Sequence, residues 1–105
     1  MINFNEIELD EILDQRENPM FDREWNRVYR HVEELKKGTV IHESKKIQKR
    51  VFISVFERSM SDELAGYICD DFGLIAESKA VGFSDAWLDK LIACYERAVV
   101  PCGKL

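Results

Sequence analysis

The chain of 105 residues is predicted to form an all-α, single compact domain, residues 1–105, of about five helices joined by short loops. Three observations predict this fold class. Apolar residues recur every three or four positions in several segments, which is the period of one helix face. Helix start and stop signals stand at the borders of these segments. No hairpin turn or set of partner strands accompanies the one segment that could also be extended.

The first two helices have clear predicted boundaries. The first runs from a cap at Asn5, with Glu8 in capping-box position, to about Arg16. The second opens at Asn18-Pro19, where proline occupies the first helical position, and stops before Gly38. Its apolar residues form a regular stripe, so we expect them to be core: Phe21, Trp25, Val28, Tyr29, Val32 and Leu35.

Residues 45–59 fit two patterns, after a connector at 39–44. One set of positions forms a helical face: Ile47, Val51, Phe52, Val55 and Phe56. Val51, Ile53 and Val55 also alternate as they would in a strand. We predict a helix because partner strands are lacking elsewhere, and the strand remains the alternative.

The segment 62–79, which follows a capping cluster at 59–62, is predicted to be a central helix covered by neighbours on most sides. Its apolar face is broad and comprises Leu64, Tyr67, Ile68, Phe72, Ile75 and Ala76. What remains is a narrow ridge of Glu63, Gly66, Asp70, Gly73 and Glu77. Glycine in a helix interior costs about 1 kcal/mol relative to alanine. We therefore expect this ridge either to pack against another helix or to face a partner.

A last helix is expected after the cap Ser84, and Pro101 ends it. Its stripe consists of Leu88, Leu91, Ile92, Tyr95 and Val99. Residues 102–105 are expected to fray.

Charge and composition limit the function classes. The net charge of −5 disfavours nucleic acid as a partner, because phosphate binding requires a basic surface. Residues 1–20 carry a net charge of −5, residues 21–60 carry +4 and residues 61–105 carry −4. These blocks either neutralise one another across the fold or leave an acidic face for a basic partner. The acidic start does not resemble a signal peptide, no apolar run is long enough for a membrane span, and the three cysteines lack CxxC spacing. A cytoplasmic protein without a membrane partner is expected.

Neither a metal site nor a catalytic constellation is predicted. His31 and His42 lack further ligands at suitable spacing. Asp70 and Asp71 are adjacent on a helix and point about 100° apart, so they cannot share a proton as a catalytic dyad does. No cysteine is expected to be paired with a base, and no glycine-rich phosphate loop exists. We therefore expect a protein that is not an enzyme and needs no cofactor.

Two stretches carry a family resemblance: GYICDDFGLIA at 66–76 and GFSDAWL at 82–88. They resemble the small acidic bacterial proteins encoded beside polymorphic toxins, which include immunity proteins of contact-dependent growth inhibition. The resemblance implies a cytoplasmic protein that binds and blocks a cognate toxin domain, often a nuclease with a basic active site. It implies no catalytic residue.

The candidate partner-binding residues are acidic side chains of the C-terminal half and one tryptophan among them. Carboxylates can replace phosphates against a basic toxin surface. The candidates are Asp70, Asp71, Glu77, Asp85, Trp87 and Asp89. Trp87 stands between acids and is either an interface anchor or a core residue.

The alternative function is a regulatory or adaptor domain whose protein partner meets the basic middle, Arg23 to Arg58. Within it, Arg23, Arg27 and Arg30 form a ridge at helical spacing. This ridge either binds an acidic ligand or is a solvated face paired with the acidic first helix.

Overall fold

The computed structural model describes residues 6–105, and the side chains from residue 8 onward. It contains five helices over this range: α1 (Glu6–Arg16), α2 (Pro19–Lys36), α3 (His42–Ser59), α4 (Asp62–Val81) and α5 (Ala86–Glu96). No strand occurs in the same range, so the all-α prediction and the helix predicted at 45–59 are confirmed. The predicted cap Asn5 lies outside the described residues.

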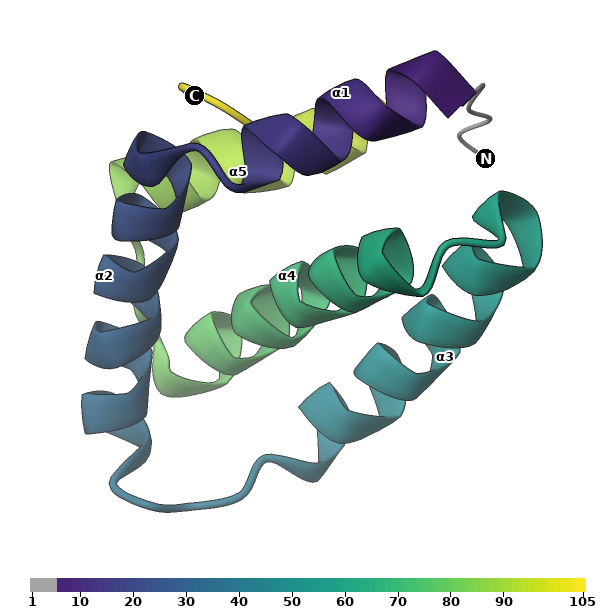
Figure 1. The fold of residues 1–105 in the computed structure, drawn as a ribbon. Coiled ribbons are helices and arrows are strands. Elements are labelled where there is room, and N and C mark those ends of the chain that lie inside the picture. The colour runs from purple at the N-terminus through teal and green to yellow at the C-terminus, as the bar shows by residue number, and fades with distance from the viewer. Residues whose placement is uncertain (1–5) are drawn as a thin grey trace.

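Helix α4 runs through the middle of the molecule (Figure 1). Helices α1, α2 and α3 all contact it, and α5 reaches it through the Phe72 and Tyr95 rings, whose centroids lie 4.8 Å apart. Its buried residues surround the helix: Leu64, Ala65, Ile68, Asp71, Gly73, Leu74, Glu77 and Ser78. The prediction of a central helix covered on most sides is therefore confirmed.

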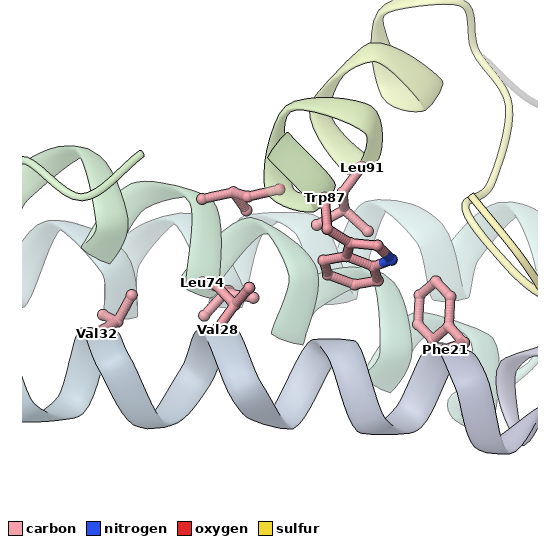
Figure 2. Close-up of a cluster of buried hydrophobic side chains, with 7 residues drawn as sticks. Phe21, Val28, Val32, Leu74, Trp87 and Leu91 are labelled. Atoms are coloured by element: carbon pink, nitrogen blue, oxygen red, sulfur yellow. The ribbon is translucent and has the colours of Figure 1, made fainter. Parts of the chain in front are cut away.

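Two hydrophobic clusters form the core, and α4 contributes to both. The first joins α2, α4 and α5 through residues that include Phe21, Leu74 and Trp87 (Figure 2). The second is built on Leu64 and Ile68 of α4, with partly buried side chains of α1 and α3 packed against them. Burial of apolar surface contributes about 25 cal/mol per Å² to folding, so these clusters hold the helices together.

Local capping chemistry sets several predicted boundaries. The side chain of Asn18 accepts a hydrogen bond from the backbone N–H of Met20 at the start of α2. Ser61 accepts one from Leu64 in the same way at the start of α4. Gly82, with φ of +74°, ends α4 in the left-handed conformation that glycine adopts without steric cost.

Other boundaries differ from the prediction. Helix α3 begins at His42, so part of the predicted connector is helical. Asp85, and not Ser84, caps α5, because its carboxylate accepts a hydrogen bond from the N–H of Leu88. That helix ends at Glu96, well before Pro101. Ser84 and Asp85 are both favourable cap residues, so cap preference alone does not distinguish between them.

The C-terminal tail is packed, so the prediction that it frays was wrong. Val100, Pro101 and Gly103 are buried. The N–H of Gly103 donates to the carbonyl of Gln15 at 3.0 Å, and the carbonyl of Pro101 accepts from Arg16 at 3.2 Å. These bonds tie the tail to the end of α1, a contact between positions far apart in the chain.

Two residues of the predicted α2 core stripe are exposed. Tyr29 keeps 41% of its surface accessible and Leu35 keeps 48%. The buried face of α2 is narrower than the apolar stripe, because only Phe21, Val28 and Val32 face the first hydrophobic cluster directly. Trp25 is half-buried between that cluster and the surface.

None of the five helices in residues 6–105 combines the length and apolar character needed to cross a bilayer.

Candidate functional site

The buried carboxylate of Asp71 is the polar centre of the structure. The guanidinium of Arg16 donates to both of its oxygens, with 2.8 Å between Nη2 and Oδ1. The indole N–H of Trp25 donates to the same Oδ1 at 2.8 Å, and the hydroxyl of Tyr95 donates to Oδ2. Because these side chains come from α1, α2, α4 and α5, one carboxylate fixes four helices relative to one another.

Arg16 is enclosed by aromatic rings as well as bonded to Asp71. Its guanidinium carbon lies 4.4 Å from the ring centroid of Phe21 and 4.9 Å from that of Tyr67. Burial opposes the charge, but the hydrogen bond to Asp71 and its negative charge hold the pKa of Arg16 above its ordinary value. Burial, followed by the charge of Asp71, raises the pKa of Tyr95, so this phenol stays protonated as a donor. No local sequence signal indicates that Arg16 is buried, and the network was not predicted.

A groove lies along α4 on the side of α2, and it consists of two hollows that share Trp25 and Asp70. The first hollow, of about 200 Å³, is also lined by Arg16, Phe21, Asp22, Asn26 and Tyr67. The second hollow, of about 360 Å³, extends to α3 and is also lined by Tyr29, Glu33, Lys36, Lys45, Gln48, Gly73, Leu74 and Glu77. We call the two together the α2–α4 groove.

The aromatic wall of the groove is held in place from behind. Trp25 and Tyr29 stack with their ring centroids 5.5 Å apart and their planes inclined by 18°. The bond from the Trp25 indole to buried Asp71 fixes the ring at the groove surface. The stack of half-buried Trp25 and exposed Tyr29 presents aromatic surface to a partner at little conformational cost, which is typical of interface anchors.

Asp70 is the exposed carboxylate that the two hollows share. Among residues 8–105 it forms no ion pair with a lysine or arginine side chain. Partial burial, followed by the charge of neighbouring Asp71, raises its pKa above the ordinary aspartate value. Burial, followed by the charge of Asp70, raises the pKa of the neighbouring Cys69 thiol to about 11, which lowers the fraction of reactive thiolate.

Three of the six predicted partner-binding residues have buried side chains: Asp71, Glu77 and Trp87. Glu77 accepts hydrogen bonds from Lys36 at 3.0 Å and from Ser44 at 2.7 Å. The Trp87 ring packs edge-on against Phe21 (Figure 2), with 5.3 Å between centroids. The fold already engages all three side chains, and of them Glu77 also lines the second hollow of the α2–α4 groove.

The other three candidates divide between two faces. Asp70 faces the groove. Asp85 binds the guanidinium of Arg27 at 2.9 and 3.0 Å, and this pairing lowers the pKa of Asp85. Asp89 is exposed on α5. No observation tests whether any of the six contacts a partner, so their role remains a prediction.

Among residues 8–105, the arginine ridge of α2 forms no ion pair with α1, which was one of its two predicted roles. Arg27 binds Glu24 of its own helix and Asp85 beyond the end of α4, while Arg23 and Arg30 are exposed. The one basic residue of the acidic segment 1–20, Arg16, points into the interior and pairs with Asp71.

No group of three or more potential ligands that could hold a metal ion occurs among residues 8–105. The model of one protein family, described as immunity protein PIM1, matches residues 1–102 of the chain. No curated protein and no solved structure matches it.

Proposed function

The chain belongs to the PIM1 family of immunity proteins, and from this premise we propose that it neutralises a basic toxin domain by binding it through the α2–α4 groove. The toxin is of the nuclease type in this proposal. The inhibitor binds one toxin domain stoichiometrically and blocks the basic site that would otherwise hold phosphates.

We choose the groove as the binding surface because Asp70 is exposed there without an ion-pair partner among the described side chains, in the same hollow as the Trp25–Tyr29 stack. Asp22 and Glu33 line the same groove, and two of its three basic side chains, Arg16 and Lys36, are already paired with carboxylates. Nuclease surfaces are basic because they bind phosphates. Carboxylates complement such a surface, and tyrosine and tryptophan supply most of the binding energy at many interfaces.

Charge complementarity of this kind mainly increases the association rate. Exposed charges further apart than about 8 Å at physiological salt are largely screened, so the acceleration falls as salt rises. An immunity protein benefits from fast capture, since the toxin acts until it is bound.

The test is coexpression with the toxin encoded by the adjacent gene, followed by binding kinetics. We expect the wild-type protein to restore growth, and Asp70→Asn to slow association at low salt. Asp89→Asn is the matched control, because it removes the same charge from an exposed position on α5. If Asp89→Asn weakens binding and Asp70→Asn does not, the toxin binds the α5 face and the groove assignment is wrong. Failure of the wild-type protein to restore growth would refute toxin neutralisation.

A cytoplasmic location and a role in contact-dependent growth inhibition are part of the same proposal. Cys69, Cys94 and Cys102 are all free thiols, which fits a reducing compartment. Cell fractionation tests the location, and recovery of the protein in the periplasm would contradict it.

The adaptor function is the second candidate, and the outer face of α3 favours it. Phe52, Ile53 and Phe56 are exposed there on a helix rich in lysine and arginine. Phe56→Ser tests which of the two surfaces the protein uses. Intact toxin neutralisation by this variant supports the groove, whereas its loss with an unchanged thermal midpoint places the essential surface on α3.

A further inference from the structure

We propose that the second hollow of the α2–α4 groove receives a single arginine side chain of the toxin, with the Trp25–Tyr29 stack as its wall and the Asp70 carboxylate as its counter-ion. This inference rests on the proposed function and specifies the anchor group that the groove recognises.

The molecule itself shows how this helix pair holds a guanidinium. Arg16 lies against two aromatic rings, Phe21 at 4.4 Å and Tyr67 at 4.9 Å, and its charge is matched by Asp71. Planar guanidinium groups stack on aromatic faces and bind carboxylates with two parallel hydrogen bonds. Arg16 and its two rings line the first hollow, while the Asp71 carboxylate that binds Arg16 is fully buried behind them.

The second hollow combines the same kinds of group without a basic side chain on its carboxylate. Trp25 and Tyr29 supply the two rings, and Asp70, the neighbour of Asp71 in sequence, supplies the acid. No described lysine or arginine pairs with Asp70. Phe21 and Tyr67 both lie against Arg16, whereas Trp25 and Tyr29 stack on each other, so a guanidinium bound to Asp70 would meet the outer surface of that stack.

The charge of the lining fits one monovalent cation. Three carboxylates, Glu33, Asp70 and Glu77, face two lysines, Lys36 and Lys45, which leaves a net charge of −1. Lys36 is already engaged by Glu33 at 2.9 Å and by Glu77 at 3.0 Å, so its charge does not oppose a cation at Asp70 strongly. A single arginine neutralises the hollow.

Size and rigidity favour the same ligand. A volume of about 360 Å³ lies at the lower end of small-ligand sites and admits a guanidinium with part of its methylene stem. Trp25 is fixed by its bond to Asp71 before any partner arrives. Binding then costs little ordering of the wall, which increases affinity.

Arginine is preferred to lysine because the site offers flat surfaces. A guanidinium stacks on an aromatic wall and still donates to Asp70 at its edge, whereas an ammonium is a compact and strongly hydrated charge. A surface that attracted cations only through its net charge would bind arginine and lysine side chains with equal affinity.

The first experiment needs no toxin. Hexa-arginine and hexalysine peptides are titrated into the ¹⁵N-labelled protein at one ionic strength, and the two indole N–H signals are followed by NMR. We expect hexa-arginine to bind at least about threefold more tightly and to shift the Trp25 signal but not that of buried Trp87. Asp70→Asn and Tyr29→Ala should each remove the arginine preference, while Asp89→Asn should retain it. Equal affinity for both peptides, or equal effects of Asp70→Asn and Asp89→Asn, overturns the inference.

The second experiment uses the cognate toxin and separates this inference from the proposed function. A carboxylate that only steers the encounter changes the association rate, whereas one paired with a desolvated cation changes the dissociation rate. We expect Asp70→Asn and Tyr29→Ala each to accelerate dissociation by about tenfold or more with unchanged thermal midpoints.

If Asp70→Asn and Tyr29→Ala dissociate as slowly as the wild type and still neutralise the toxin, the proposal that the second hollow binds an arginine is refuted and the inhibitor function stands. If the wild type does not bind the toxin at all, the inhibitor function fails, whereas the peptide titration still reports on the hollow itself.

Discussion

Two glycines on one ridge of α4 provide a direct test of how that helix is packed. An added Cβ at Gly66 meets no heavy atom within 4 Å beyond its chain neighbours and the backbone of its own helix turn. At Gly73 it would lie 2.5 Å from Nε2, 2.6 Å from Cδ and 2.9 Å from Cγ of Gln48 on α3. The same methyl group therefore enters open space at one position and a filled contact at the other.

The two alanine substitutions should change stability in opposite directions. Gly66→Ala should stabilise the fold by about 0.5–1 kcal/mol, through helix propensity and a smaller unfolded-state entropy. Gly73→Ala should destabilise it by about 1–2 kcal/mol, because the Gln48 side chain must leave its position from Cγ outward. For a chain of this length, 1 kcal/mol corresponds to a shift of about 4–8 °C in the thermal midpoint.

Urea unfolding of the two variants measures both effects, and Gln48→Ala supplies the control. In that background the obstructing atoms are gone, so Gly73→Ala should become stabilising by about 0.5–1 kcal/mol, as at Gly66. A stabilised Gly73→Ala variant in the wild-type background would refute the close packing of α3 on this ridge.

The remaining predictions concern ionised groups. Asp71→Asn should destabilise the protein by about 3–5 kcal/mol, since Arg16 stays buried without its counter-ion; a urea midpoint shift as small as that of an exposed aspartate would contradict this. Pairing with Arg27 lowers the pKa of Asp85 in the folded protein. The folding stability that this pair contributes is therefore fully present above the unfolded-state pKa of about 4, and it is lost as the pH falls through the lower folded-state pKa. Melts of Asp85→Asn should therefore differ from the wild type at pH 7 and converge with it toward pH 2. Toxin association should weaken as the pH falls through the raised pKa of Asp70, before ordinary exposed aspartates are protonated, and Asp70→Asn should lack this step in stopped-flow rates.

The amino-acid sequence determined the helical segments and most of their ends. Periodicity and capping depend on residues within four or five positions of each other, so Asn18 and Ser61 cap the helices as local rules require. The helical identity of 45–59 also followed, because no other part of the chain offered a partner strand.

Tertiary structure alone decided which polar side chains are buried. Helical spacing places Asp70, Gly73 and Glu77 on one ridge, but it does not tell which neighbouring helix covers each part of that ridge. Helix α3 covers Gly73, Lys36 and Ser44 bind Glu77, and Asp70 stays exposed.

The network around Asp71 has the same origin. Arg16 lies 55 positions from Asp71 in the chain, and Trp25 lies 46 positions from it. A buried ion pair is stable only when both partners and their remaining hydrogen bonds meet in one place. That condition depends on how α1, α2, α4 and α5 pack together, and no short stretch of sequence contains it.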